Sequence, residues 1–300
     1  MEKISFILTY CTVENDKHLL LDIKKSGWLK QTDSDAIYQS TINVIHNINK
    51  YCRYPHEIIL VDNSDTWKPI DIDNLTVIKG LQSLTKSQLK RDPYILEHND
   101  YKMCILEEFT DINNLTMHVS LGMYYGTKHA SGDYIVLQHN DFYYHGNHFK
   151  EMIKELNQSY AYISADNKKV WMGSYAGYSE VRKLLGEDVK FSPFDGGYVR
   201  TEFGFADMYF FMCKKEFFDD YDIDWKYGDS NHGATLHCIN NDWKYLHLRP
   251  YYDNPNFPTA DETQHTYYLG DKKFGTHLKG GISENRMSNK ITRDKWLQNL

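Results

Sequence analysis

The segment SGDYIVLQHND, residues 131–141, decides the fold because an apolar run ends abruptly in three polar residues. Its centre, residues 133–138, is aromatic and β-branched, which predicts a buried strand. The segment before it, about residues 114–130, has helical spacing, and Gly132 closes that helix. The polar end, residues 139–141, is either a strand that reaches solvent or a strand tip that binds a ligand.

Further strands and helices alternate along the chain on both sides of this segment. Apolar runs predict strands at residues 4–12, 56–64, 74–80 and 160–166. Apolar residues at helical spacing predict helices at about 34–52 and 148–156. Strands with continuous apolar cores that alternate with helices predict an α/β fold, with a mainly parallel sheet sandwiched between helices.

Polar residues gather at the carboxyl ends of three of these strands. They are Thr9, Tyr10, Asp62, Asn63, His139 and Asp141. In open parallel sheets, ligands bind just beyond the carboxyl ends of the strands. The sequence therefore predicts a binding site at this edge of the sheet.

Composition excludes several classes of protein. The formal net charge of −7 gives no positive field for nucleic acid, so no nucleic-acid partner is expected. The first apolar run, about eight residues, is too short for a membrane span, and no other segment approaches that length. The five cysteines are scattered and contain no CxxC, which favours free thiols and a cytoplasmic location. A zinc site at His145 and His148 lacks a cysteine or third ligand to complete it.

The stretch GMYYGTKHASGDYIVLQHND, residues 122–141, resembles a motif of the glycosyltransferase A fold, closest to family-2-like nucleotide-sugar transferases. His139 and Asp141 occupy its two acidic positions. ISFILTYCT and EIILVDNS are similar to two other strands of that family. The residues in register with the motif are Gly126, Ala130, Gly132, Asp133, Tyr134, Ile135 and Leu137.

The resemblance spans about residues 4–250 and departs from the family at three places. One of them is the acidic pair expected near residue 230, which is not clean. His139 replaces the usual first aspartate, and Met123 with Tyr124 replaces an Arg-Asn pair. It implies a transferase domain at 1–250, with a nucleotide-binding half at 1–141 and an acceptor half at 142–250. Residues 251–300 would form a C-terminal tail that could act as an active-site lid.

The implied activity is metal-dependent transfer of a hexosyl or related sugar from a nucleotide-sugar, with UDP favoured, to a saccharide or other hydroxyl acceptor, with inversion. Asp62 would accept a hydrogen bond from the base, and Thr9, Tyr10 and Asn63 would line the nucleotide pocket. A carboxylate can do this because it only accepts hydrogen bonds when ionised. The alternative for Asp62 is that it caps the turn after its strand.

The resemblance also implies a metal at Asp141, where Mg²⁺ or Mn²⁺ would bind through oxygen and bridge the donor's phosphates. His139 would bind a softer ion such as Mn²⁺, or contact the ribose or phosphate. A solvated strand end remains the alternative for both residues.

Two later segments offer further site residues. Asp229, just before a predicted helix, stands about where the family has its general base, with His232 as its rival and a helix-capping role as the alternative. The resemblance further implies that in THLKGGISENR, residues 276–286, His277 would be a metal ligand, and that Lys279, Gly280 and Arg286 would contact the diphosphate. His247 and His265 compete with His277, and a basic surface loop is the alternative.

Two other functions remain open. A nucleotidyltransferase would need a glycine-bearing loop after the first strand, and TYCTVENDKH contains no glycine. A non-catalytic carbohydrate-binding relative would explain His139 and the imperfect base at Asp229, whereas Asp62 and Asp141 count against it.

Overall fold

The computed structural model of the protein describes residues 2–10, 34–80, 122–123, 125–171, 198–220, 230–250 and 265–277. The strands of this part are β1 (Ile4–Tyr10), β2 (His56–Asp62), β3 (Leu75–Lys79), β4 (Tyr134–Gln138), β5 (Phe142–Tyr144), β6 (Tyr162–Trp171), β7 (Tyr198–Lys214), β8 (Leu246–Pro250), β9 (His265–Leu269) and β10 (Lys272–His277). Its helices are α1 (Ser34–Tyr51), α6 (Phe149–Gln158), α8 (Lys215–Asp220) and α9 (Ser230–Asn240). Residues 122–123 and 125–127 are helical as well.

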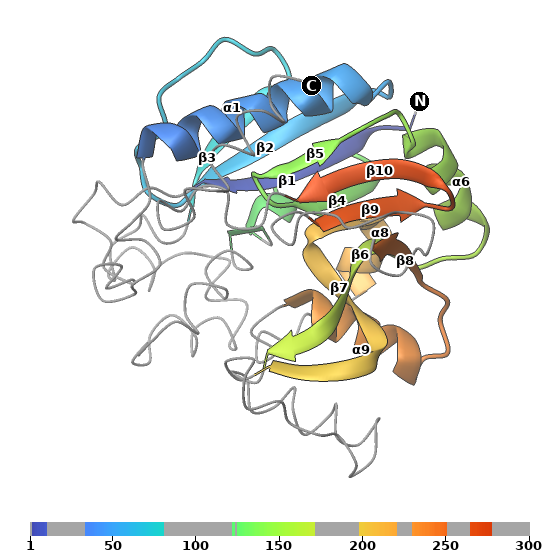
Figure 1. The fold of residues 1–300 in the computed structure, drawn as a ribbon. Coiled ribbons are helices and arrows are strands. Elements are labelled where there is room, and N and C mark those ends of the chain that lie inside the picture. The colour runs from blue at the N-terminus through green and yellow to red at the C-terminus, as the bar shows by residue number, and fades with distance from the viewer. Residues whose placement is uncertain are drawn as a thin grey trace.

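The strands form one sheet in the order β3-β2-β1-β4-β7-β6-β8-β9-β10-β5 (Figure 1). Strands β3, β2, β1 and β4 are parallel, with β1 between β2 and β4. The rest is mostly antiparallel: β7 pairs with β4 and β6, and β10 pairs with β9 and β5. The predicted α/β fold is confirmed, with a parallel core of four strands, although the complete sheet is mixed rather than mainly parallel.

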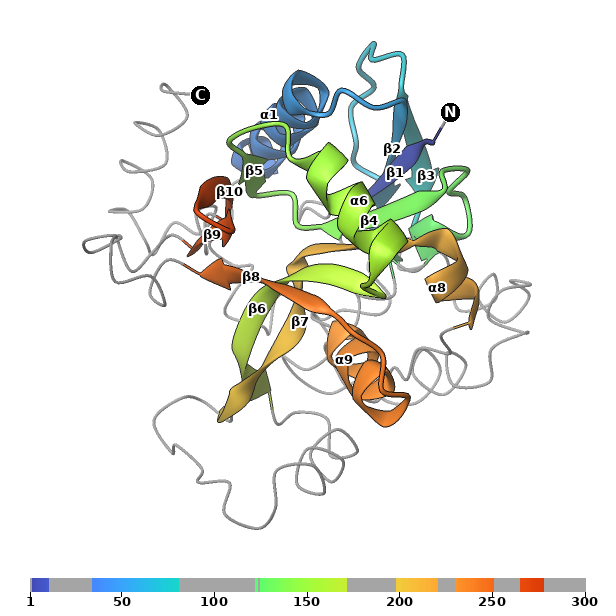
Figure 2. The same cartoon turned by 90° about the vertical axis from the view of Figure 1, so that its right-hand side faces the viewer.

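Helices cover both faces of the parallel strands. α1 and α6 pack on the face that carries Phe6 and Leu8, and Figures 1 and 2 show these helices on the same side of β1 and β4. α8, α9 and the helical residues near Met123 pack on the face that carries Ile7. Strand β1 is therefore buried on both faces, as its continuous apolar run predicts.

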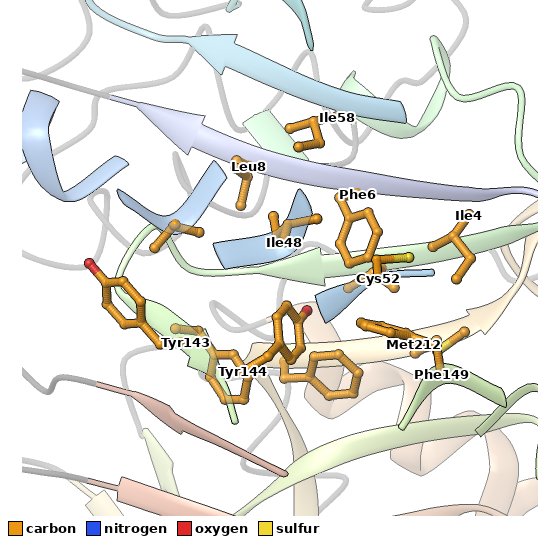
Figure 3. Close-up of a cluster of buried hydrophobic side chains, with 14 of the residues drawn as sticks. Ile4, Phe6, Leu8, Ile48, Cys52, Ile58, Tyr143, Tyr144, Phe149 and Met212 are labelled. Carbon is orange, nitrogen blue, oxygen red and sulfur yellow. The ribbon is translucent and has the colours of Figure 1, made fainter. Parts of the chain in front are cut away.

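Figure 3 shows the core on the α1 face, where side chains from β1, α1, β5 and α6 meet. Phe6 packs edge-on against Phe149 at 5.4 Å between ring centroids and against Tyr144 at 6.3 Å. Rings in such geometry contribute about 0.5–1.5 kcal/mol per pair beyond the area they bury. This core fastens β5 to the parallel sheet.

Helix α1 also carries buried polar side chains, which bind the segment that follows β4. The Asn47 side chain accepts from the Tyr144 backbone N–H at 2.7 Å and donates to its carbonyl at 3.1 Å. Asn140 donates to the Thr41 hydroxyl at 3.2 Å, and the Ser40 hydroxyl donates to the Asn140 carbonyl at 3.3 Å. These bonds fix the turn between β4 and β5 on the helix.

Part of the predicted C-terminal tail belongs to the sheet. Strands β9 and β10 form a hairpin whose two connecting residues are Gly270, at φ +60°, and Asp271. A two-residue connection with a glycine at positive φ suits antiparallel strands. Residues 251–264 and 278–300 lie outside the described part, so the lid remains a prediction. No described helix is long and apolar enough to cross a membrane.

At the amino ends of β1 and β2, Glu57 joins three segments of the chain. Its carboxylate accepts bonds from Lys3 Nζ at 2.7 Å, from Ser5 Oγ at 2.6 Å and from the Ser131 backbone N–H at 2.6 Å. Burial alone would raise its pKa, but these partners outweigh that effect and lower the pKa from 4.5 to about 2. The network therefore stabilises the fold only while Glu57 is ionised.

We expect Glu57→Gln to destabilise the protein more at pH 7 than at pH 3. Because the folded pKa lies below the unfolded value, the contribution of Glu57 is complete above about pH 4.5 and is lost as the pH falls toward 2. Urea unfolding of both proteins at several pH values measures this difference. A difference in unfolding free energy that stays constant from pH 7 to pH 3 would refute the assignment.

Candidate metal centre

The turn after β4 positions the first two site residues. The His139 backbone N–H donates to the Tyr209 carbonyl on β7 at 3.3 Å, and the Phe142 N–H donates to the His139 carbonyl at 3.3 Å. The chain then continues directly as β5. This short turn, held by α1 on one side and β7 on the other, places the His139 and Asp141 side chains at the carboxyl end of the sheet.

The last residue of β10 supplies a third side chain to the same place. His277 pairs with Phe142 across the β10–β5 ladder. Its Nε2 lies 3.0 Å from Asp141 Oδ1, and His139 Nδ1 lies 3.9 Å from the same oxygen. One potential ligand atom from each of the three residues falls within 4.8 Å of the others. The structure thus brings His277 beside His139 and Asp141, which lie more than 130 positions earlier in the sequence. We call this group the His-Asp-His cluster.

The Asp141 carboxylate is buried, with 7% of the residue exposed, and its Oδ1 accepts no hydrogen bond from the described residues. A buried acceptor without a partner costs about 1–3 kcal/mol, and more when it is charged. His277 Nε2 makes an ion-pair contact with this oxygen at 3.0 Å. An oxygen with this surplus of lone pairs beside two imidazoles suits a bound cation.

Electrostatics keep the ligand atoms of the cluster available. Burial by itself would raise the pKa of the Asp141 carboxyl, but the facing imidazoles of His277 and His139 outweigh it and hold that pKa below its ordinary value. Burial and the nearby His277 lower the pKa of His139 to about 4, against a smaller opposing effect of Asp141. At neutral pH the cluster therefore presents an anionic oxygen and a neutral His139 imidazole, the forms that bind metal.

Tyr209 packs against both imidazoles. Its ring stacks on His277 at 3.7 Å and 14°, and meets His139 edge-on at 5.0 Å. It lies on an irregular stretch of β7, where Ser164 pairs with Phe211 and Ala165 with Asp207, so that residues 208–210 are additional. Such bulges redirect side chains beside functional sites. Tyr209 was not predicted as a site residue, because the direction of its side chain depends on this bulge.

A second polar position lies at the end of β2. Asn63 is 3% exposed, and its Oδ1 has no hydrogen-bond partner among the described residues. The backbone approaches it so closely that a Cβ on Gly80 would lie 1.9 Å from this oxygen, and a Cβ on Gly122 would lie 2.9 Å from Nδ2 and 3.1 Å from the Thr9 methyl. Thr9 and Asn63 are therefore neighbours in a tight polar corner, as the sequence predicts.

Asp62 and Tyr10 are already engaged within the chain. The Asp62 carboxylate accepts bonds from the Ser64 N–H and hydroxyl, both at 2.9 Å, and from the Trp67 N–H at 2.9 Å. This is the turn-capping alternative, and it ends β2 at Asp62 rather than at residue 64. Tyr10 is 3% exposed and packs edge-on against Trp67 at 4.9 Å. Their roles toward a nucleotide stay predictions.

The remaining predicted site residues are mostly outside the described part. Asp229, Lys279 and Gly280 lie there, whereas His232 is in the first turn of α9 without a described side chain. Of the competitors for the metal, His247 lies apart from the cluster, beside the Tyr162 hydroxyl at 3.1 Å, and burial lowers its pKa to about 4. His265 pairs with His277 through the backbone, and its side chain is not described.

No protein-family model and no curated protein matches this chain. Solved structures similar to it include mouse xyloside xylosyltransferase 1 in its apo form, with 9% identity, 82% of this chain and 85% of that chain covered, and a TM-score of 0.42. Glucosyl-3-phosphoglycerate synthase from Mycobacterium tuberculosis, in complex with Mn²⁺, UDP and phosphoglyceric acid, is 11% identical, with 92% and 86% covered and a TM-score of 0.37.

The 4-diphosphocytidyl-2C-methyl-D-erythritol synthase from Anaerococcus prevotii is also similar, at 13% identity, with 86% and 93% covered and a TM-score of 0.35. Because every one of these TM-scores lies below 0.5, the likeness concerns general architecture and assigns no role to any residue.

Proposed function

We propose that this chain is a metal-dependent transferase that takes a sugar from a nucleotide-sugar donor, with UDP as the favoured nucleotide, and passes it to a hydroxyl acceptor. The observation that carries the proposal is the His-Asp-His cluster at the carboxyl end of β4, with its buried Asp141 carboxylate beside two imidazoles. Mn²⁺ and Mg²⁺ are the ions that the resemblance in sequence implies. A divalent cation bound there would neutralise the charge that develops on a leaving diphosphate.

The order of the strands supports a nucleotide that lies across the end of β1. Asn63 follows β2 and the cluster follows β4, and β1 lies between those two parallel strands. Two interstrand spacings separate the two positions by roughly 10 Å. In this arrangement Asn63 Oδ1 and Thr9 would bind the nucleoside, while His139, Asp141 and His277 would hold the diphosphate end through the cation.

Transfer with inversion needs a base for the acceptor hydroxyl, and we assign this role to Asp229, which precedes α9 in the sequence, or to His232 in the first turn of α9. Helix α9 packs on β7, the strand that carries Tyr209. Acceptor specificity would then arise in the half of the chain that follows β5.

A thermal-shift screen tests the proposal. UDP, GDP, CDP and TDP are each added with and without Mn²⁺, to the wild type and to Asp141→Asn. We expect one nucleotide to stabilise the wild type only with metal, by about 2.7 kcal/mol at 100 times its dissociation constant. Asp133→Asn is the matched control, since Asp133 is exposed at the opposite end of β4 and should leave this response unchanged.

Product analysis distinguishes the two enzyme classes. A glycosyltransferase should slowly release the nucleoside diphosphate from its sugar-linked donor, with water as a poor acceptor. A nucleotidyltransferase would instead release pyrophosphate from a nucleoside triphosphate and a sugar phosphate. If no nucleotide stabilises the wild type at any metal concentration, both enzyme readings are wrong.

A further inference from the structure

We propose that the His-Asp-His cluster selects a nitrogen-preferring divalent ion of the late first transition row, such as Co²⁺ or Zn²⁺, over Mg²⁺ and Ca²⁺. The inference deepens the proposed function, because it rests on the same three residues holding the cation. The proposed function names only a divalent cation, whereas nitrogen ligation by two imidazoles would select the class of ion.

The ligand atoms of the cluster are two imidazole nitrogens and one carboxylate oxygen. Mg²⁺ and Ca²⁺ are bound through oxygen, and Mg²⁺ sites use carboxylates together with water and phosphate oxygens. Imidazole suits zinc, copper, iron and nickel, and affinity for a given site rises from Mn²⁺ through Co²⁺ toward Cu²⁺. A site with one carboxylate and two imidazoles therefore favours the later ions.

The spacing of the ligand atoms fits one ion. Bonds of about 2.0–2.2 Å hold neighbouring donor atoms about 3.0–3.4 Å apart. His277 Nε2 and Asp141 Oδ1 already have this spacing, at 3.0 Å. His139 Nδ1, at 3.9 Å from the same oxygen, has to approach by roughly 0.5–1 Å.

The surroundings hold the two rings in place before any ion binds. The ring centroids of His139 and His277 are 5.2 Å apart, and the angle between the ring planes is 72°. The Tyr209 ring stacks on His277 and meets His139 edge-on. Rings that are held in position favour a fixed coordination geometry, which is how proteins discriminate among metals of similar affinity. The His277 nitrogen is thus held at coordination spacing from Asp141, and the His139 ring has to move closer.

The single carboxylate has a second consequence. A divalent ion held by one anionic and two neutral ligands keeps a net charge of +1 and has open coordination positions. Anionic oxygens, such as those of a diphosphate, would neutralise this charge and occupy the open positions. The same ligand set therefore favours a late transition ion and an anionic substrate.

Direct metal binding to the chelator-treated protein, without nucleotide, tests the inference. Isothermal titration with Mg²⁺, Ca²⁺, Mn²⁺, Co²⁺ and Zn²⁺ should give affinities for Co²⁺ and Zn²⁺ at least about 10-fold higher than for Mg²⁺. Bound Co²⁺ should also show visible absorption bands that change when nitrogen ligands are lost. Equal affinity for Mg²⁺ and Co²⁺, or no binding of any ion, would overturn the inference.

His139→Asp provides the decisive comparison, because it replaces a nitrogen donor with a carboxylate. We expect the ratio of Co²⁺ to Mg²⁺ affinity to fall by about 10-fold or more, with Asp133→Asn unchanged. His277→Asn, which removes the other nitrogen donor, should lower the affinity for Co²⁺ more than that for Mg²⁺. An unchanged ratio in a folded His139→Asp would show that nitrogen ligation does not set the preference.

These outcomes are separable from those of the proposed function. If the chain binds Co²⁺ tightly but no nucleotide, the ion preference holds and the transferase proposal fails. If a nucleotide binds equally well with Mg²⁺ and with Co²⁺, the transferase proposal stands and the ion preference fails.

Discussion

Asp141→Asn is expected to remove divalent-cation binding, with a loss of affinity greater than about 100-fold. Even the loss of an outer hydrogen-bond partner lowers metal affinity by about 10–100-fold, and Asp141 supplies the only anionic atom of the described cluster. Asparagine keeps the shape of the side chain, so the buried position is filled as before. Isothermal titration of Co²⁺ or Mn²⁺ into both proteins measures the difference.

The control for this variant is again Asp133→Asn, which removes a carboxylate from the same segment without touching the cluster. Asp133 Oδ2 accepts the Lys3 N–H at the amino end of the sheet. The Asp133→Asn variant should bind metal as the wild type does. Comparable affinities for Asp141→Asn and the wild type would place the metal elsewhere and remove the basis of the proposed function.

Phe142→Ala is expected to lower the free energy of unfolding by about 3–5 kcal/mol and to weaken metal binding as well. Phe142 is fully buried, stacks on Phe210 at 5.6 Å and packs against Phe274 at 5.9 Å. It follows Asp141 directly and pairs with His277 in the ladder. Truncation would therefore loosen both strands that carry metal ligands.

Phe6→Ala separates the two effects. Phe6 is equally buried in the same core, but it lies on β1 and carries no neighbouring ligand. Urea unfolding should show a similar loss of unfolding free energy for both variants, whereas metal titration should show weakened binding only in Phe142→Ala. Phe142→Leu, with a cost of roughly 1–2 kcal/mol, serves if the alanine variant does not fold. Equal metal affinity in the Phe6 and Phe142 variants would refute this coupling.

The parallel half of the fold could be predicted because its signals are local. The apolar run in β1 and the helical spacing of apolar residues in α1 each predict their element from one short stretch of sequence. The observed helix, Ser34–Tyr51, agrees with the predicted 34–52. The polar ends of β2 and β4 follow from the same runs. Parallel pairing then brings those ends to one edge of the sheet, which is why the region of the site was predictable.

The pairing of the antiparallel half could not be predicted, because it depends on distant residues, although the strand at 160–166 was predicted as part of β6. β5 has only three residues and is a strand by virtue of β10, which begins 128 positions after it ends. Gly275 of β10 makes room for Phe142, since a Cβ there would lie 2.4 Å from its ring. No local sequence pattern predicts that Phe142 packs against Gly275. The Gly270-Asp271 turn was the available signal for the hairpin.

For the same reason, His277 was predicted as one of several competing ligands and Tyr209 was missed. The choice among His247, His265 and His277 depends on which strand ends beside Asp141, and that is a property of the complete sheet. For Asp62, the resemblance in sequence suggested a role toward the base. In the structure, local hydrogen bonds engage both of its carboxylate oxygens.

The most direct test of the central claim is anomalous diffraction from crystals grown with Co²⁺ and UDP. We expect one anomalous peak about 2.0–2.3 Å from the ligand atoms of His139, Asp141 and His277, with the diphosphate oxygens completing the coordination. A peak at any other position, with this cluster empty, would contradict the claim that these three residues form the metal centre.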